Sequence, residues 1–548
     1  MNLFSHYRLL FSAFSLTFFL STSLFAKDYY FHPRKGSDAQ SGLSAEEAFQ
    51  NLSKIQSLEL KPGDRILLAS GEEFKGSILI DKFKGIKETP LIIQSFGNSE
   101  LPFALINAAG EEAGVLIQNS AHIQVKNLRI QANGKGNTEA SFPMRVGVLV
   151  RSTMGSSTSN ILLEELQIEQ IFYESVGFQR GESEVKTANG TQKYGWGIRL
   201  MANGPDQEIE QVVIKNCTIR NLAHTGIKLT GNNQQSIRNI TITGNQVKQV
   251  GGPGIQMSGV KFVYVADNRV SHSGSTDDSR KWGRGSGLWT WGSSMVLIEK
   301  NQFLYANGPG DSAGAHIDFN CDNIILQYNL SAYNAGGFCE ILGNNYNCAY
   351  RYNISVNDGH RVKGENGAFQ EGKTLWLSGY QGGKKPRKGP VNSYIYNNTI
   401  YVDEDIVSKI AIDNRSKGVL IANNIFHIEG KSQLVDGDQY KPDDKSSRAI
   451  EDVFFKNNLF LHAENWPMQA LIQPEDSHFG NVEFANPGGM SVKDYIPQKS
   501  EMLKGIAIPF LPADQFGLMG EMNLKQDILG NPNGKNPGIG AINFVEKP

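Results

Sequence analysis

The chain has 548 residues, a formal net charge of −2 and a hydrophobic fraction of 39%. The balanced charge excludes a strongly basic nucleic-acid-binding protein and a polybasic protein of membrane surfaces. The hydrophobic fraction is sufficient for a large core and excludes a disordered chain. Glycine occurs 58 times, and together with the many asparagines it favours short strands and turns over helices.

Residues 1–26 have the pattern of an export signal. Arg8 gives a positive start, the run from Leu9 to Leu20 is apolar apart from serine and threonine, and Ala26 ends a segment suited to cleavage. The apolar run is shorter than the ~20 residues that a membrane-spanning helix needs. We therefore expect a cleaved signal peptide, no integral membrane segment, and a final location in the periplasm or outside the cell.

The four cysteines of the chain follow this signal, and an exported protein could oxidise them. They lack the paired spacing of a zinc site, and a chain of this length does not need a disulfide scaffold. We expect buried free thiols, with at most one disulfide bond. The four residues are Cys217, Cys321, Cys339 and Cys348.

A six-residue pattern recurs along the chain, with an apolar residue at its start, an apolar residue at its end in nine of eleven copies, and Asn at the fourth position in eight of eleven. The copies start at Val125, Leu163, Ile214, Ile242, Val265, Ile298, Leu326, Tyr350, Ile395, Ile421 and Phe455. Asn tolerates the left-handed conformation of a sharp bend and can hydrogen-bond its backbone neighbours. We expect the recurring Asn to stack at one corner of a repeating coil, as an internal polar ladder without a catalytic role.

A second pattern, Gly–apolar–x–apolar, precedes the first one in several repeats. Its alternation marks strands with one buried face. Repeats of 20–30 residues that contain only short strands indicate a solenoid. The copies are Gly147–Val150, Gly197–Leu200, Gly226–Leu229, Gly254–Met257 and Gly287–Thr290.

These repeats, the opening segment Tyr29–Asp38, the motif Lys61–Asp64 and the ending Gly538–Ile542 resemble those of right-handed parallel β-helix proteins of the pectate-lyase-like kind. That family consists of secreted proteins that act on polysaccharides. The resemblance implies an all-β, single-stranded right-handed parallel β-helix over residues 65–460. An N-terminal cap would cover residues 27–64, and an irregular closing segment residues 461–548. Ser44 begins a capping box, which predicts a helix to about Ser57.

The family places its substrate along the first strand of each coil, and the Gly–apolar–x–apolar strand matches that strand. Its variable position would point outward and stack from coil to coil at ~4.8 Å. Cations, an amide, indoles and carboxylates in one column suit a sugar site better than a solvated wall. The column is Arg199, Lys228, Gln256, Trp289, Asp318, Glu340 and Trp376.

Candidate catalytic residues lie in two adjacent coils. Strand alternation places His316 and Asp318 on the outer face and Ile317 and Phe319 in the core. Glu340 follows in the next coil, and we expect it to point outward because an unpaired charge is costly to bury. Two carboxylates suit glycoside hydrolysis, where one donates a proton and the other activates water or attacks the sugar. His316 could tune Asp318 or act as a base.

Three alternatives remain open from the sequence. A polysaccharide lyase or epimerase acting on uronic acids would need a base and a positive centre, which Lys228, Arg199, His316 or Arg284 could supply. The chain could also be a non-catalytic glycan-binding surface protein. Lastly, the two carboxylates could be structural and cap turns or pair with Arg351. We expect an enzyme, with a glycoside hydrolase ahead of a lyase.

The sequence gives little support for a cofactor. Calcium is possible, but no cluster of several Asp recurs along the outward column, and Asp277 and Asp278 are a lone pair in a loop. We expect no required cofactor, no metal ligand, a polysaccharide or oligosaccharide substrate, and a monomer. Trp289 and Trp291 share one face of their strand, and Trp289 is expected to stack on a sugar ring.

Overall fold

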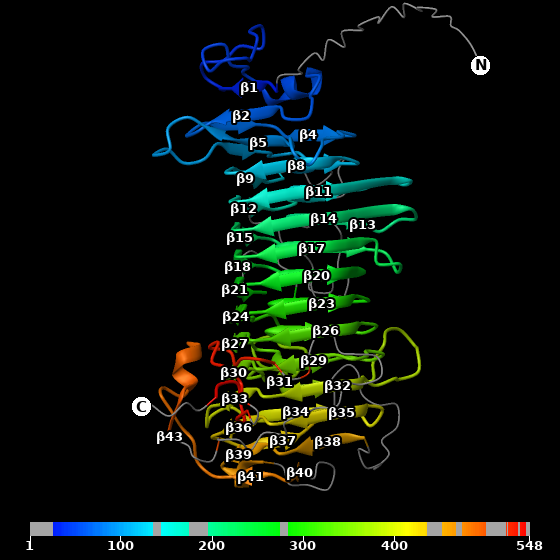
Figure 1. Cartoon of the computed structure of the whole chain (residues 1–548), viewed down its shortest axis with the longest axis vertical. Coiled ribbons are helices and arrows are strands. Elements are labelled where there is room, and N and C mark those ends of the chain that lie inside the picture. Colours follow the sequence, from blue (N-terminus) through cyan, green and yellow to red (C-terminus); the bar gives the residue numbers. More distant parts are fainter. Residues whose placement is uncertain are drawn as a thin grey trace, which may run out of the picture.

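The computed structural model describes residues 26–134, 144–174, 195–274, 283–435, 452–466, 474–499, 503, 522, 524–534 and 537–543. The predicted signal peptide lies outside these residues except for Ala26, and so does the pair Asp277 and Asp278. The described chain forms one tall stack of short strands, with the earliest strands at one end and the latest at the other (Figure 1). Three long sheets, named sheets A, B and C, run the length of the stack.

Sheet A has 15 strands, each hydrogen-bonded to the strands before and after it in the stack. From one end to the other they are β1 (Asp28–Phe31), β2 (Arg65–Ala69), β5 (Leu91–Phe96), β8 (Ala121–Lys126), β11 (Ser156–Glu164), β14 (Gln207–Lys215), β17 (Ile237–Thr243), β20 (Val260–Ala266), β23 (Ser294–Glu299), β26 (Asp322–Gln327), β29 (Ala349–Arg351), β32 (Val391–Tyr396), β35 (Lys417–Ala422), β38 (Val453–Lys456) and β40 (Pro474–Glu475).

Sheet B has 14 strands. They are β3 (Glu73–Lys75), β6 (Leu105–Asn107), β9 (Arg129–Ala132), β12 (Gln167–Ile171), β15 (Thr218–Leu222), β18 (Gln246–Val250), β21 (Arg269–Ser273), β24 (Gln302–Leu304), β27 (Leu330–Ala332), β30 (Ile354–Val356), β33 (Thr399–Val402), β36 (Ile425–Ile428), β39 (Leu459–Leu461) and β41 (His478–Phe479).

Sheet C has 12 strands and contains the Gly–apolar–x–apolar segments. They are β4 (Ile78–Asp81), β7 (Ala113–Gln118), β10 (Arg145–Arg151), β13 (Gly195–Ala202), β16 (Ile227–Gly231), β19 (Ile255–Ser258), β22 (Leu288–Trp291), β25 (Ala315–Ile317), β28 (Gly337–Ile341), β31 (Lys373–Leu377), β34 (Ser408–Ile412) and β37 (Ser432–Leu434).

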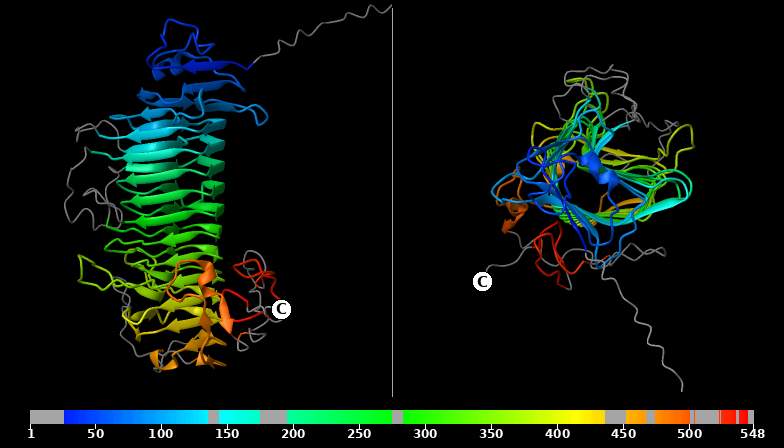
Figure 2. Two further views of the ribbon diagram at one scale, coloured as in Figure 1. Left: turned by 90° about the vertical axis from the view of Figure 1, so that its left-hand side faces the viewer. Right: turned by 90° about the horizontal axis from the view of Figure 1, so that it is seen from above.

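From β2 to β36, each strand pairs in parallel with the strand three places later in the chain, so three strands make one coil. In sheet C, for example, β13 pairs with β16 through Ile198 and Ile227. Seen along the stack, successive coils lie over one another around a common interior (Figure 2). The predicted all-β parallel β-helix is confirmed.

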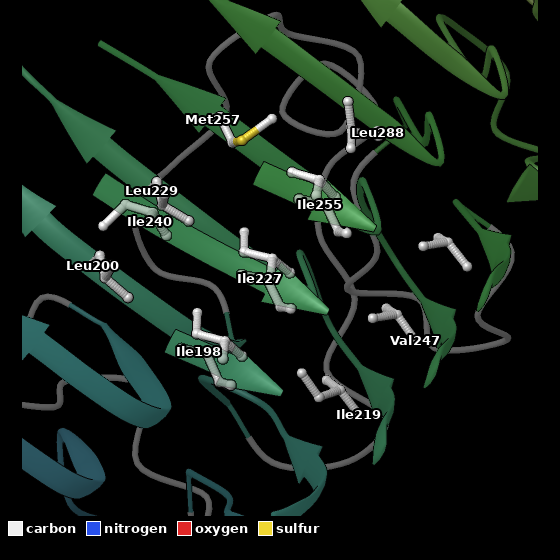
Figure 3. Packing of buried hydrophobic residues seen from close by; sticks show 14 of the residues in the cluster. Ile198, Leu200, Ile219, Ile227, Leu229, Ile240, Val247, Ile255, Met257 and Leu288 are labelled. Atoms are coloured by element: carbon white, nitrogen blue, oxygen red, sulfur yellow. The ribbon is translucent and has the colours of Figure 1, made fainter. Parts of the chain in front are cut away.

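The interior is filled by the apolar positions of all three sheets. Ile227 from sheet C, Ile240 from sheet A and Val247 from sheet B point toward one another (Figure 3). The recurring glycine is required by space at the corner between sheets B and C. A Cβ on Gly226 would lie 2.5 Å from Val247 Cγ1 and 2.8 Å from the Gly254 carbonyl oxygen. The glycine pattern is therefore a packing requirement of the coil.

The predicted polar ladder is present between sheets A and B. In mid-ladder, Asn329 Nδ2 donates to Asn353 Oδ1 at 3.0 Å and to the Ile298 carbonyl oxygen at 3.0 Å. One expectation about it was wrong, because the left-handed residue is the one before the ladder Asn, such as Tyr328 with φ 57°. The ladder residues are Asn245, Asn268, Asn301, Asn329, Asn353, Asn398, Asn424 and Asn458.

The predicted helix from Ser44 to about Ser57 is not present. Ser44 Oγ does accept a hydrogen bond from the Glu47 N–H at 3.3 Å, but the segment continues as turns and ends in the 3₁₀ helix η1 (Leu52–Ser57). The other helices in the described chain are η2 (Ala463–Asn465) and η3 (Val492–Tyr495), both 3₁₀. None of the helices in the described chain has the length and apolar character needed to cross a membrane.

The last residues return beside the lower coils (Figure 1). After β41, strands β42 (Glu483–Phe484) and β43 (Pro497–Lys499) form an antiparallel pair. Further on, the Gly538 carbonyl oxygen accepts from Asn397 Nδ2 at 2.8 Å, and the Met522 carbonyl oxygen accepts from Tyr396 Oη at 2.6 Å. The expected free thiols are confirmed, since all four cysteines are buried and unbridged.

Candidate active site on sheet C

Strand register in sheet C brings most of the predicted site residues into one outward column. Trp289 pairs with His316, and Ile317 pairs with Ile341, which sets Glu340 beside His316. Residues on either side of the outward position belong to the core. In order, the column is Arg199, Lys228, Gln256, Trp289, His316, Glu340 and Trp376.

Asp318 lies beside this column and not in it. Strand β25 ends at Ile317, and the Asp318 N–H donates to the Thr290 carbonyl oxygen at 2.9 Å. Phe319, which we expected in the core, instead contacts the ring of Trp291 with centroids 5.9 Å apart. That expectation was wrong because alternation stops where the strand stops. The position of Asp318 is therefore set by the point where β25 ends, and not by strand alternation.

Glu340 points outward, as expected, because its neighbours Cys339 and Ile341 both lie in the core. It is nevertheless enclosed, with only 6% of its surface exposed. Pairing with Arg351 is wrong as an alternative, since that guanidinium lies in sheet A and donates to Gln327 Oε1 at 2.8 Å. Glu340 is thus available to the outer face of sheet C.

Both carboxyl groups have raised pKa values. The pKa of Asp318 is raised to about 7, mainly by burial and also by the negative charge of Asp311, while the Phe319 N–H and Arg284 oppose the shift. Burial raises the pKa of Glu340 to about 8, with contributions from Asp311 and Asp318 that Lys373 opposes. Such shifts in an enclosed cluster are typical of functional sites.

Asp311 is the residue that the sequence analysis missed. It lies in the loop between β24 and β25, where Arg284 Nη1 contacts Asp311 Oδ1 at 2.7 Å. Its charge acts on His316, Asp318 and Glu340. A loop residue follows no strand alternation, so the repeat pattern could not reveal it. The available signal was an acid four residues before the strand that carries His316.

His316 is buried in this cluster. Its ring stacks on Trp289 with centroids 5.9 Å apart and an interplanar angle of 4°. Its Nδ1 lies 3.1 Å from Ser286 Oγ. Burial lowers the pKa of His316 to about 4, so the imidazole is neutral near pH 7. A neutral ring can hold a hydrogen bond to the site but brings no positive charge to it.

The cationic part of the column lies at earlier coils. Arg199 is buried, with its guanidinium carbon 4.2 Å from the ring centroid of Trp196. Lys228 Nζ lies 5.7 Å from the same ring, and burial beside Arg199 lowers the pKa of Lys228 to about 7. Gln256 accepts from Thr225 Oγ1 at 3.5 Å. These residues form a region next to the acidic cluster, separated from His316 by the coil that carries Trp289.

The two remaining predicted substrate-binding residues are both largely buried. Arg284 is in the ion pair with Asp311, so it positions a carboxylate of the site. Trp376 is 6% exposed, and Lys373 Nζ lies 4.1 Å from its ring centroid. Trp289 and Trp291 are each partly exposed and share a face, as expected. The part of the site open to a ligand ring therefore centres on these two indoles.

Potential metal ligands gather elsewhere in the described residues. His427, Glu429 and His462 could each direct one ligand atom to a common ion. They belong to coils on the sheet B side, whereas the acidic cluster lies on sheet C.

Comparisons with known proteins agree with this architecture. A family model described as a right handed beta helix region matches residues 201–382. A lacto-N-biosidase of Bifidobacterium longum subsp. longum is 24% identical, and the match covers 73% of this chain and 28% of that protein. The chain therefore spans under a third of the length of that relative.

Solved structures give a similar result for the fold. The native GH136 lacto-N-biosidase from Eubacterium ramulus superposes with a TM-score of 0.53 at 18% identity, covering 75% of this chain and 68% of that one. Its selenomethionine derivative gives 0.50 at 17% identity, covering 83% and 68%. The present chain is a right-handed parallel β-helix protein.

Proposed function

We propose that this chain is an exported glycoside hydrolase whose active site lies on the outer face of sheet C. The observation that carries the proposal is a pair of partly buried acids, Asp311 and Asp318, in unlike environments. Asp318 has its pKa raised to about 7 by burial, whereas Asp311 faces the permanent positive charge of Arg284 at 2.7 Å. Glycoside hydrolysis uses two carboxyl groups whose environments differ in this way.

In this proposal Asp318 is the general acid. A carboxyl group with a pKa of about 7 keeps its proton at mildly acidic pH and can give it to the leaving oxygen of the sugar. Asp311, which contacts Arg284, is the carboxylate that activates water or attacks the anomeric carbon. Both acids lie close to β25, one in the loop before the strand and one directly after it.

Glu340 has a different role from the one expected from the sequence. With its pKa raised to about 8 by burial, it is protonated near neutral pH. A neutral carboxylic acid is a poor nucleophile, but it can donate a hydrogen bond to a sugar hydroxyl. We therefore assign the role of base or nucleophile to Asp311 and a binding role to Glu340.

The aromatic residues supply the platform for a sugar ring. Trp289 and Trp291 are partly exposed beside the acids, and His316 stacks on Trp289. An indole presents an apolar face to the CH groups of a pyranose. The proposed substrate is therefore an oligosaccharide or polysaccharide that lies along the column, with the cleaved bond near Asp318.

Two similar proteins are named lacto-N-biosidases, which supports a glycosidase over a lyase. Elimination on a uronic acid is the second candidate, because Lys228 with a pKa near 7 could act as a base. Of the cations whose charge acts on the acids, Arg284 contacts Asp311, Lys373 lies over the ring of Trp376, and Arg361 donates to the Gln370 carbonyl oxygen. These cations are thus already engaged by groups of the protein. Elimination needs a cation for the substrate carboxylate and hydrolysis does not, so this arrangement favours hydrolysis.

Product analysis on a glycan panel tests the proposal. The panel contains substrates of lacto-N-biosidases and neutral and uronic-acid polysaccharides, and the control is Asp318→Asn. We expect new reducing ends without the ultraviolet absorbance of unsaturated uronates, and loss of product in the variant. Unsaturated products would establish elimination instead. Binding of glycans by both proteins with no product from either would overturn the enzymatic proposal.

A further inference from the structure

A second cluster of ionisable side chains lies near the C-terminal end of the stack. His427 is in β36, Glu429 follows directly after this strand, and His462 follows β39 in the next coil. His427 and Leu461 are paired in register, so His462 lies one residue further along the neighbouring coil. One ligand atom from each of the three side chains lies within 4.8 Å of the other two.

The contacts within this cluster all converge on one carboxylate. Glu429 Oε1 lies 2.5 Å from His427 Nε2, and Glu429 Oε2 lies 3.2 Å from His462 Nε2. The other ring nitrogen of His462, Nδ1, lies 3.7 Å from Glu464 Oε1. Both imidazoles therefore direct their Nε2 atoms at the Glu429 carboxylate.

Within the part of the chain that the structure describes, Glu429 has no permanent positive charge beside it. Among the described residues, no lysine or arginine nitrogen lies within ion-pair distance of Glu429, whose ion-pair partners are the two histidines. His427 is only 5% exposed, and its ring packs against Tyr401 and Phe484 with centroids 5.0 and 5.8 Å away. A partly buried carboxylate facing two imidazoles is a site where a bound cation would be favoured.

We propose that His427 Nε2, His462 Nε2 and a carboxylate oxygen of Glu429 bind one Zn²⁺ ion, with water as the fourth ligand. Two imidazole nitrogens and one carboxylate oxygen are a ligand set typical of Zn²⁺. Binding requires Nε2 to be unprotonated, so each ring carries its proton on Nδ1. In His462 that proton faces Glu464, which matches the carboxylate that commonly orients a metal-bound histidine.

The ion would connect the β36 coil to the β39 coil near the end of the solenoid. Terminal repeats lack a neighbour on one side and need other interactions to stay folded. The proposed ion would add a tie between two coils, and its binding is independent of the chemistry on sheet C.

Zinc titration of the tag-free full chain, after treatment with a chelator, tests the proposal. We expect one Zn²⁺ per chain by calorimetry, a higher thermal midpoint with Zn²⁺, and the visible spectrum of a tetrahedral site when Co²⁺ is substituted. His462→Ala and Glu429→Gln should weaken binding by ~10²-fold or more, and Glu464→Gln by ~10-fold. His272→Ala is the matched control, because His272 is also a sheet B histidine with a left-handed backbone.

Three outcomes would overturn the proposal. The first is no Zn²⁺ binding to the wild-type chain at micromolar concentrations, which would leave the cluster as a hydrogen-bonded group. The second is unchanged affinity in His462→Ala, whose side chain is 37% exposed and whose loss leaves the core intact. The third is loss of binding in Asp318→Asn, which would place the ion at the acids. Glycosidase assays of the same variants show whether a change in Zn²⁺ binding occurs without a change in hydrolysis, so failure of the zinc proposal can be told from failure of the proposed function.

Discussion

Two stacks of polar side chains run through the same coils and differ in composition. The ladder between sheets A and B repeats one residue type, and each amide bonds the next, as Asn301 Nδ2 does with Asn329 Oδ1 at 3.1 Å. The sheet C column changes residue type at every coil and contains groups with shifted pKa values, such as Lys228 and Glu340. Repetition of one side chain thus indicates a structural role, and variation at a repeated position indicates chemistry.

The difference has a physical basis. An internal amide satisfies the same donors and acceptors in every coil, so one residue type serves at all of them. A ligand, in contrast, presents different groups along its length, and the column must match each one separately. Acids with raised pKa values occur both in a structural position, at Asp358, and beside the sheet C column, at Asp318. Replacing each one gives a direct test.

The largest expected effect is loss of activity when either Asp318 or Asp311 is replaced. Asp318→Asn removes the proton donor, and Asp311→Asn removes the base or nucleophile, while both keep a similar shape. We expect each to lower kcat by at least ~10²-fold, the usual contribution of a general acid or base. Glu340→Gln should have a smaller effect, mainly on KM. Initial rates and thermal midpoints of the purified variants would measure this.

Asp358 provides the matched control. Burial also raises its pKa to about 7, but its Oδ1 accepts from Asn334 Nδ2 at 2.9 Å and its Oδ2 from Ser355 Oγ at 2.9 Å. It lies in a repeated structural position on the sheet B side. Asp358→Asn should therefore leave kcat within about twofold. Equal loss of activity in Asp358→Asn and Asp318→Asn would contradict the catalytic role of Asp318. The raised pKa would then be a result of burial at both residues, without a link to catalysis.

The fold was predictable because each coil repeats the same requirements. Alternating apolar residues, the corner glycine and the ladder Asn are all local in sequence, and each recurs many times. The candidate site was predictable only in part. Trp289 and His316 followed from strand alternation, but Asp311 lies in a loop and Phe319 lies beyond the end of β25. Strand ends depend on contacts with neighbouring coils, which a single sequence does not display.

The next largest effect should be on stability when the ladder is interrupted. In Asn329→Ala, the N–H and Nδ2 of Asn301 lose their acceptor, and the Ile298 carbonyl oxygen loses a donor. Leaving such groups buried without partners should cost about 3 kcal/mol. Denaturant unfolding would measure the change. Asn245→Ala, at the start of the ladder next to Cys217, should cost less. Equal costs would contradict a cooperative ladder.

The pH dependence of stability should report the raised pKa of Asp318 on the sheet C side. Burial holds the folded pKa of Asp318 near 7, above its value in the unfolded chain. The stability gained is fully present below the unfolded pKa and is lost as pH rises through about 7. Asp318→Asn removes this loss, so its thermal midpoint relative to wild type should be higher at pH 8 than at pH 5. His316 titrates in both proteins and cancels in the comparison.

Activity should follow the same group in the same direction. The proposed acid must carry its proton, so kcat/KM of the wild-type chain should fall as pH rises through about 7. A pH–rate profile across this range would show the descending limb. A rate that rises through pH 7 would indicate that the group acts as a base, and would favour elimination over hydrolysis.

The smallest expected effect is on substrate affinity when the aromatic platform is reduced. Trp289 is partly exposed and lies between the cationic residues and the acids. Trp289→Ala removes a stacking surface worth about 1 kcal/mol, so KM should rise by ~5- to 10-fold with kcat little changed. The control is Phe262→Ala, because Phe262 is 47% exposed on the outer face of sheet A and lies outside the column. A fall in kcat with unchanged KM would mean that Trp289 acts by packing against His316, and not by contact with the sugar.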